Sequence, residues 1–279
     1  MNTTPLHLVL SLLLLTLTPV TSAADTLNLW VHPFLPATEL VKKFKPLADY
    51  LSHECGQHIQ VKISKSYNSH ITGAGKDEMD IAYLGPAPYV KVTSTYGKKR
   101  LLARLEVNYK PFFHGLIITR QDSPLNNLQD LHGKNFAFGD PDSTMSFLVP
   151  SFMLSQNGVE IKDLNSHDFL GSHHNVVLSV LGGYYDAGAI KEEVYMEYQE
   201  RGIKILAKSP AIAEHLFVAG NKLPDATVDK LRRAMLNLKD HNILSSIKKT
   251  VTGLAPVTDG DYEELRRILH NSSSAEAKQ

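Results

Sequence analysis

Cysteine is almost missing from this sequence of 279 residues, which contains only Cys55. A single cysteine cannot form an internal disulfide, so the stability of the fold must come from an apolar core. Cys55 lies in "YLSHECGQ" at an expected helix end, where the spacing H-x-C-x-x-H matches no strong zinc pattern. We expect a small, semi-buried side chain there, with a reactive or soft-metal-binding thiol as the alternative.

An excess of charge is also missing, because 29 lysines and arginines balance 29 aspartates and glutamates. This balance excludes a bulk attraction to nucleic acid or to an acidic membrane surface. The sequence also lacks the patterns GxSxG, HExxH and GxxxxGK[ST]. We therefore expect no catalytic residues, no metal site and no cofactor.

Long apolar runs are absent except for "LHLVLSLLLLTLTPV" near the N-terminus, which "TSAA" follows. This arrangement is typical of a signal peptide over residues 1–24, cleaved near Ala23 or Ala24. The run is too short for a persuasive membrane anchor. We therefore expect export to the periplasm.

The rest of the chain alternates between strand-like and helical stretches, and its 43% hydrophobic residues suit a globular fold. The alternation predicts an α/β fold with largely parallel sheets. A self-contained α/β stretch lies between "FFHGLIITR" and "IKILAKSPAIAEHLFVAG". We predict a discontinuous lobe from 25–114 and 209–279, a second lobe from 115–208, and a ligand cleft between them.

The sequence predicts three helices with definite bounds. Apolar spacing predicts a helix over 37–56, in which Pro46 predicts a kink or a break. A second helix is predicted over 143–158, with Pro150 in its second turn. The amphipathic stretch 225–243 predicts a third.

The stretch "GDPDSTMSFLVP" from Gly139 to Pro150 gives the clearest indication of a binding site. An apolar strand, an Asp-Pro turn and then Ser143 and Thr144 place free N–H groups at the positive end of a helix dipole. With the two hydroxyls, this end could hold a phosphate-like anion. The alternative is a plain helix cap made by one of the hydroxyls.

This stretch resembles the pattern "GDPxSTSGFLVP" of the periplasmic phosphate, phosphite and phosphonate-binding proteins of ABC importers. "DIAYLGPAPYV", "DSPLNNLQDLHGKNFAFGD", "GSHHNVVLSVLGGYYDAGAI" and "LAKSPAIAEHLFV" resemble further segments of that family in the same order. The resemblance covers residues 27–270 and implies the two-lobed fold of type II periplasmic binding proteins, closing on a ligand.

The resemblance also implies a ligand shell. The aromatic positions fall on Tyr67 and Tyr83, and the hydroxyls of the helix N-terminus on Ser143 and Thr144. The family's histidine falls on His173, with His174 beside it, and its later acid falls on Glu193. Hydroxyls, N–H groups and histidine would hold anionic oxygens, and the acid would meet a cation or a protonated ligand oxygen.

The sequence departs from the family at two places. Met145 replaces the third hydroxyl of "STS", and Ser146, which replaces the glycine, could supply a hydroxyl about 100° further round the helix. His215, beside Glu214, replaces the aspartate that meets the amine of aminophosphonates. Met145 would admit softer ligands, and His215 disfavours an aminoalkylphosphonate.

The expected function is the capture of a small oxyanion for the membrane permease of an ABC importer. The alternative is a periplasmic subunit that senses its ligand for a histidine kinase, with a non-phosphorus oxyanion such as arsenite as a candidate ligand. We also expect the protein to be a monomer without a nucleic-acid partner.

Overall fold

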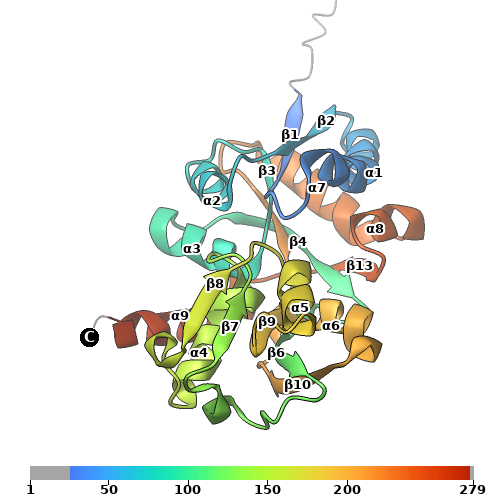
Figure 1. The fold of residues 1–279 in the computed structure, drawn as a ribbon. Coiled ribbons are helices and arrows are strands. Elements are labelled where there is room, and N and C mark those ends of the chain that lie inside the picture. The colour runs from blue at the N-terminus through green and yellow to red at the C-terminus, as the bar shows by residue number, and fades with distance from the viewer. Residues whose placement is uncertain (1–25, 277–279) are drawn as a thin grey trace, which may run out of the picture.

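The computed structural model describes residues 26–276, which form two large β-sheets with helices on both faces of each (Figure 1). The predicted signal peptide over residues 1–24 lies outside the described residues. Within the described part of the chain, no helix is both long and apolar enough to cross a membrane. We call the six-stranded sheet with its helices lobe 1, and the five-stranded sheet with its helices lobe 2.

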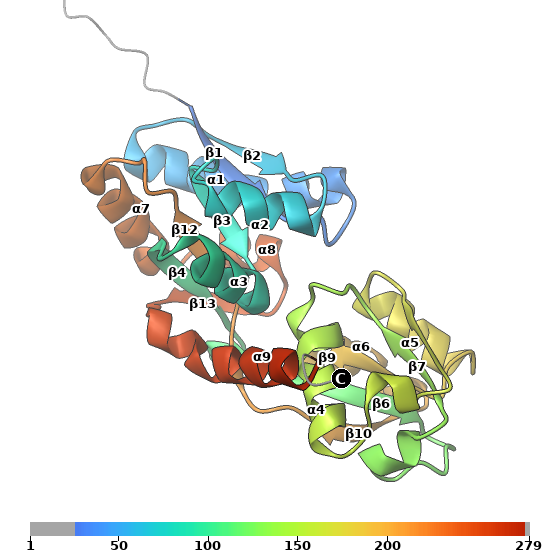
Figure 2. The ribbon, with the colours of Figure 1, turned by 90° about the vertical axis from the view of Figure 1, so that its left-hand side faces the viewer.

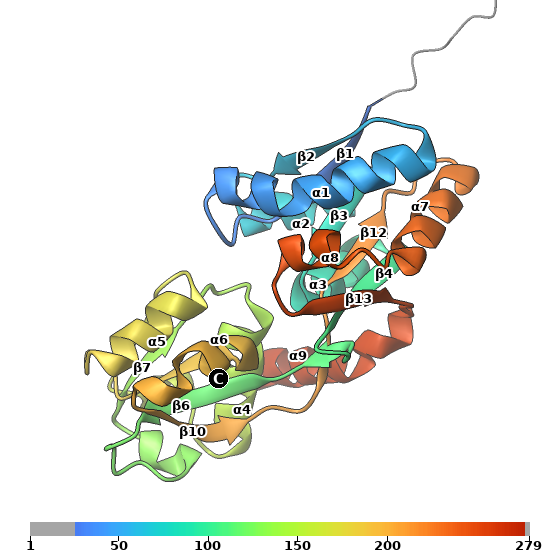
Figure 3. The ribbon, with the colours of Figure 1, turned by 90° about the vertical axis from the view of Figure 1, so that its right-hand side faces the viewer.

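Lobe 1 is built on a sheet with the strand order β13-β4-β12-β3-β1-β2. Its strands are β1 (Leu27–Val31), β2 (Ile59–Ile63), β3 (Ile81–Leu84), β4 (Arg100–Val107), β12 (Leu216–Ala219) and β13 (Val251–Ala255). One face is covered by α1 (Ala37–Cys55), α7 (Asp225–Asn237) and α8 (His241–Ile247), as Figure 3 shows. The other face is covered by α2 (Tyr67–Gly75) and α3 (Pro86–Tyr96).

Lobe 2 is built on a sheet with the strand order β10-β6-β9-β7-β8. Its strands are β6 (Gly115–Arg120), β7 (Asn135–Phe138), β8 (Ser166–Phe169), β9 (Ala187–Lys191) and β10 (Ile203–Lys208). The helices α5 (His173–Leu181) and α6 (Glu192–Tyr198) pack on one face, and α4 (Val149–Gln156) packs on the other. Successive side chains of β6 and β7 therefore point to opposite faces of the sheet, and so pack alternately into the core under α4 and the core under α5 and α6.

Both sheets are mixed, so the prediction of largely parallel sheets is wrong. The strand β1 pairs in parallel with β2 and β3, and β7 pairs in parallel with β8 and β9. The strand by which the chain enters each lobe from the other runs in the opposite direction: β12 is antiparallel to β3 and β4, and β6 is antiparallel to β9 and β10. A chain that leaves a sheet and returns to it from the same side enters in the opposite direction.

Two of the predicted helices differ from expectation. The helix α1 continues through Pro46 without a break. The proline costs about 3 kcal/mol, but Leu40, Phe44, Leu47 and Leu51 are fully buried, and each such side chain stabilises the fold by about 1.5–3 kcal/mol. The stretch 225–243 divides into α7 and α8, because the Asp240 carboxylate caps a new helix by accepting the N–H of Asn242 at 2.8 Å.

The chain crosses between the lobes twice, and the crossings pair as a short ribbon of β5 (Phe112–Phe113) and β11 (Ile212–Ala213). The C-terminal helix α9 (Glu263–Glu276) then packs against α3 of lobe 1 and α4 of lobe 2 (Figure 2). One apolar core therefore includes Ile71 from α2, Met153 from α4 and Leu265 from α9. The ribbon and α9 hold the two sheets side by side.

Candidate functional site

The turn after β7 forms a tip on lobe 2 that faces lobe 1. The Ser143 hydroxyl caps it by accepting the N–H of Ser146 at 3.4 Å. The predicted single helix is in fact a short π-helix (Thr144–Leu148) followed by α4. Because Pro150 has no N–H to offer the carbonyl of Ser146, that carbonyl accepts the N–H of Gly139 at 3.1 Å instead. This bond fastens the tip to the end of β7.

Thr144 joins this tip to lobe 1. Its Oγ1 accepts the N–H of Ala87 at 3.0 Å, in the first turn of α3. The residue before that helix, at its N-cap position, is Gly85, which has no side chain to cap it. Nearby, the Lys91 ammonium pairs with the Asp142 carboxylate at 3.0 Å, again across the lobes. Two positive helix ends therefore meet, and the Thr144 hydroxyl still has its own hydrogen to donate.

The side chains of Met145 and Ser146 turn into the protein, and each is only 1% exposed. The Met145 sulfur packs so closely on Gly115 that a Cβ there would lie 3.0 Å from it. The Ser146 hydroxyl occupies the space that a Cβ on Gly139 would need, at 2.2 Å. The structure therefore gives Met145 a packing role in place of the predicted ligand contact, and it places the Ser146 hydroxyl against the backbone.

Replacing Met145 with serine tests this packing role. We expect Met145→Ser to lower the free energy of unfolding by about 2 kcal/mol, because it empties part of a filled core. We expect the affinity for oxyanions to stay within about twofold. Urea unfolding and calorimetry measure the two effects. Tighter oxyanion binding at unchanged stability would instead place residue 145 in the ligand site.

Lobe 1 and the crossing contribute a cluster of aromatic rings. The ring of His32, which is 3% exposed, lies 5.6 Å from Tyr83 and 6.1 Å from His215 and is nearly parallel to both. The ring of Tyr67, at the start of α2, lies 4.8 Å from His32. Burial raises the pKa of Tyr67 and Tyr83, and the Asp140 carboxylate of the tip adds to the effect on Tyr67. Both phenols therefore keep their protons for donation.

Two buried histidines in this cluster were not predicted. His32 and His70 both donate to the carbonyl of Tyr83, through Nδ1 at 3.3 Å and Nε2 at 2.9 Å. Burial lowers the pKa of His70 to about 4, and burial next to other histidines holds that of His32 well below its usual value. Both are neutral at pH 7. Their sequence positions, after the apolar strand 27–31 and beside Ile71, offered the only indication.

His173 occupies the start of α5, where the Ser172 hydroxyl caps the helix. Its Nδ1 accepts the N–H of Lys191 at 3.2 Å, so the ring proton must sit on Nε2. Burial, together with the positive charge of Lys191, holds its pKa well below the usual value. The neighbouring His174 is exposed and pairs with Glu197 at 3.2 Å.

The Glu193 carboxylate, predicted as a ligand group, already bridges the lobes. Its Oε2 lies 3.0 Å from the Lys191 ammonium and 2.7 Å from that of Lys248. Its Oε1 accepts the Thr250 hydroxyl at 3.0 Å. Burial alone would raise the pKa of Glu193, but the two lysines outweigh it and lower the value to about 2. Lys248 and Thr250 belong to lobe 1, so this contact ties the lobes together.

Glu214 and His215 lie on the return crossing. The Glu214 carboxylate is 1% exposed, and its Oε2 accepts both the backbone N–H and the Nδ1–H of His215 at 3.0 Å. Burial opposes ionisation of Glu214, but its bonds to His215 and the charge of Lys248 leave its pKa lowered. The Nε2 of His215 turns towards Gly85, 3.5 Å from where a Cβ would lie. His215 is thereby placed beside the start of α3.

These residues form one group, which we call the interlobe cluster. It runs from Tyr67 through His32 and Tyr83 to His215, and across α3 to the tip. His173 joins the cluster through Lys191, whose backbone N–H it binds and whose positive charge also lowers the pKa of His32. The cluster consists of His32, Tyr67, Tyr83, Ser143, Thr144, His173 and His215. The structure thus brings together six of the nine predicted site residues, with Glu193 at the edge.

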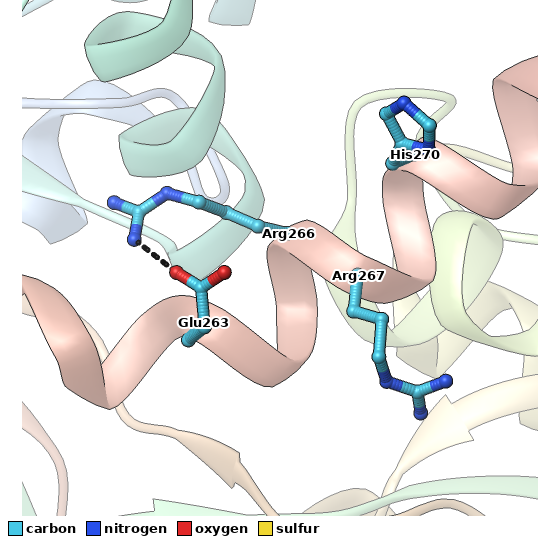
Figure 4. Close-up of a pocket in the computed structure, with 4 residues that line it drawn as sticks. All are labelled: Glu263, Arg266, Arg267 and His270. Atoms are coloured by element: carbon cyan, nitrogen blue, oxygen red, sulfur yellow. Dashed lines mark hydrogen bonds and ion pairs between the residues drawn. The ribbon is translucent and has the colours of Figure 1, made fainter.

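A separate hollow on the surface of α9 is lined by Glu263, Arg266, Arg267 and His270 (Figure 4). The Arg266 guanidinium pairs with Glu263 at 3.2 Å, and that of Arg267 pairs with Glu264 at 2.6 Å. Both arginines are therefore already neutralised. The interlobe cluster remains the candidate for anion binding.

Two mixed α/β lobes, joined by paired crossings and sharing a polar cluster, define the class of type II periplasmic binding proteins. Residues 29–262 match the model of the family described as "ABC transporter, phosphonate, periplasmic substrate-binding protein". The chain belongs to this family. The predictions of the family, of the two-lobed fold and of a binding component of an importer in place of an enzyme are confirmed.

Similar proteins agree with this assignment. The phosphate-import protein PhnD of Mycolicibacterium smegmatis is 26% identical, over 91% of this chain and 88% of its own length. The probable phosphite-binding protein PhnD1 of Prochlorococcus marinus is 25% identical, over 79% of this chain and 80% of its own. The structure of PhnD1 from that organism with methylphosphonate superposes with a TM-score of 0.79, covering 89% of this chain and 98% of that one, at 21% identity.

Proposed function

We propose that this protein captures a small tetrahedral phosphorus oxyanion, namely phosphate, phosphite or an alkylphosphonate, and delivers it to the permease of an ABC importer. The bond between Thr144 Oγ1 and the N–H of Ala87 carries this proposal. It brings the N-terminal ends of two helices from different lobes to one place. The partial positive charges of both ends favour an anion there.

The neighbouring side chains supply further donors. The hydroxyls of Ser143 and Thr144 accept backbone N–H groups and would donate their own hydrogens to the ligand. The phenols of Tyr67 and Tyr83 and the Nε2–H of His173 would add three more donors. Hydrogen bonds to a charged oxygen are the strong ones, each contributing about 1.5–3 kcal/mol.

The carboxylates beside the cluster would not repel the anion strongly. Lys191 and Lys248 neutralise Glu193, and Lys248 lies 3.9 Å from Glu214 Oε1. A ligand amine would therefore find no uncommitted carboxylate at Glu193. The pattern favours simple oxyanions over aminoalkylphosphonates.

A ligand held in this way would contact both lobes. Tyr67 and Tyr83 come from lobe 1, and Ser143, Thr144 and His173 come from lobe 2. Such a ligand favours the closed arrangement because only that arrangement offers all the donors at once. We propose that the signal peptide over 1–24 directs the protein to the periplasm, where this cycle takes place.

Binding of simple oxyanions tests the proposed function. We expect phosphate, phosphite or methylphosphonate at 100 times its Kd to stabilise the protein by about 2.7 kcal/mol, which raises Tm by roughly 5–10 °C for a domain of this size. We expect 2-aminoethylphosphonate to give a smaller rise than methylphosphonate. A thermal-shift panel that includes sulfate, arsenite and arsenate, followed by calorimetry, measures this. If none of the phosphorus oxyanions shifts Tm, the proposal is wrong.

A further inference from the structure

We infer that Lys248 changes its partner when the lobes separate, pairing with Glu193 of lobe 2 in the closed arrangement and with Glu214 in the open one. Lys248 then sets the balance between the two arrangements without touching a ligand. The inference concerns how the lobes move, so it does not depend on which ligand the protein binds.

Lys248 lies between two carboxylates. Its ammonium is 2.7 Å from Oε2 of Glu193 and 3.9 Å from Oε1 of Glu214. The first distance is that of a direct charge-assisted hydrogen bond, and the second is about 1 Å longer than such a bond. The side chain of Lys248 is 21% exposed, and a lysine stem has four flexible carbons. A small rotation of this stem therefore suffices to bring the ammonium to Glu214.

Glu214 has an oxygen that is suited to receive this ammonium. Its side chain is only 2% exposed, and both hydrogen bonds from His215 go to Oε2. The buried Oε1 accepts no hydrogen bond from any residue within 26–276. Burial alone would raise the pKa of Glu214, but its bonds with His215 and the charge of Lys248 lower it, so the carboxylate is ionised at pH 7. A buried charged oxygen without a donor is costly, and an arriving ammonium removes that cost.

Glu214 stays close to Lys248 when the lobes move, because both are fixed to lobe 1. The carbonyl of Glu214 accepts the Tyr262 hydroxyl at 2.8 Å, and two residues later the chain enters β12 of the lobe 1 sheet. Lys248 directly follows α8, which packs against β13 of the same sheet. Glu193 belongs to α6 of lobe 2. Hinge motion of two rigid lobes therefore lengthens the contact of Lys248 with Glu193 and leaves the one with Glu214.

Each charge keeps a partner in both arrangements. When lobe 2 moves away, Glu193 retains the Lys191 ammonium, which lies 3.0 Å from it on the same lobe. Lys248 meanwhile gains Glu214. Leaving a buried charge without a partner is strongly destabilising, and the exchange avoids it. The two arrangements therefore stay close in free energy, so that a ligand can shift the balance between them.

Pulsed electron paramagnetic resonance on the ligand-free full chain measures this balance. Nitroxide labels are attached at Lys42→Cys on α1 of lobe 1 and at Gln129→Cys of lobe 2, both exposed positions. The chain carries Cys55→Ala, which removes its single native cysteine. The distribution of distances between the two labels gives the ratio of closed to open protein.

The two carboxylates should act in opposite directions on this ratio. We expect Glu193→Gln to lower the ratio of closed to open protein about fivefold, because Lys248 then has Glu214 as its partner in both arrangements. We expect Glu214→Gln to raise the ratio about fivefold, because only the closed arrangement then offers Lys248 a carboxylate. A residue with a merely structural role would not favour the closed arrangement when it is replaced.

Lys248→Met distinguishes an exchange from a fixed ion pair. It removes one ion pair from each arrangement, so the ratio should stay within about twofold, and Lys248 is exposed enough for this test to remain if Glu214→Gln does not fold. The control Glu192→Gln, which affects a pair with Lys208 within lobe 2, should leave the ratio unchanged. A ratio that falls equally in Lys248→Met and Glu193→Gln, or that does not rise in Glu214→Gln, would overturn the inference.

Discussion

Replacing Ser143 and Thr144 together with alanine is expected to weaken the binding of the preferred oxyanion about 1000-fold, since each lost hydrogen bond to a charged oxygen is worth about 1.5–3 kcal/mol. Both hydroxyls lie at the tip where the two helix ends meet. The loss should appear in the binding enthalpy and Kd measured by calorimetry.

The fold should survive this change. Removing the Ser143 cap costs about 1 kcal/mol of stability, and the Ala87 N–H loses its partner in Thr144. A matched control is available in Ser94 and Thr95, consecutive exposed residues on α3. Ser94→Ala/Thr95→Ala should leave affinity within about twofold. Unchanged affinity in the Ser143→Ala/Thr144→Ala protein would show that the tip is a helix cap and does not bind the ligand.

Replacing Glu193 with glutamine is expected to cost about 3 kcal/mol of stability at pH 7, which corresponds to a pKa lowered from 4.5 to about 2 at 1.36 kcal/mol per pH unit. The carboxylate is mostly buried, and without its charge the ammonium groups of Lys191 and Lys248 lose their shared partner. Urea unfolding monitored by circular dichroism measures this difference.

The lowered pKa of Glu193 also predicts how the stability difference between the original protein and Glu193→Gln changes with pH. Because the pKa of Glu193 is lower in the folded protein, its charge stabilises the fold above about pH 4.5, and the contribution disappears as pH falls towards 2. The difference between the original protein and Glu193→Gln should therefore shrink over that range. The adjacent Glu192 pairs with Lys208 at a more exposed position, so Glu192→Gln should cost less than about 1 kcal/mol. A cost for Glu193→Gln that stays constant from pH 7 to pH 2 would contradict the ion-pair explanation.

Local chemistry explains why much of the fold could be predicted. The strands that precede Pro86 and Gly139 and the amphipathic helices follow directly from apolar spacing and turn residues. Other elements could not be predicted. The strand β8 consists of exposed residues, Ser166–Phe169, and exists because it pairs with β7. The π-helix accompanies a carbonyl of Ser146 that Pro150 leaves free and that the N–H of Gly139, the residue after β7, then binds.

The same distinction applies to the site. The motif "GDPDST" indicated Ser143 and Thr144 from sequence alone, because the hydroxyls and the helix start are adjacent in the chain. No local pattern indicated that Thr144 would meet Ala87, which is 57 positions away, or that His32 would stack on Tyr83 and His215. Glu193 matched a family position, and only the approach of Lys248 and Thr250 revealed its contact with the other lobe.

The sequence by itself determined the alternation of strands and helices, the positive helix end with its two hydroxyls, and the family to which the chain belongs, because these depend on residues that are neighbours in the chain. The tertiary structure decided which buried groups are neutral, which carboxylates are already paired, and which ring nitrogen of His173 and of His215 is already hydrogen-bonded within the protein. Those properties depend on burial and on partners far away in sequence, since a pKa or a tautomer is set by the groups that surround a ring in space.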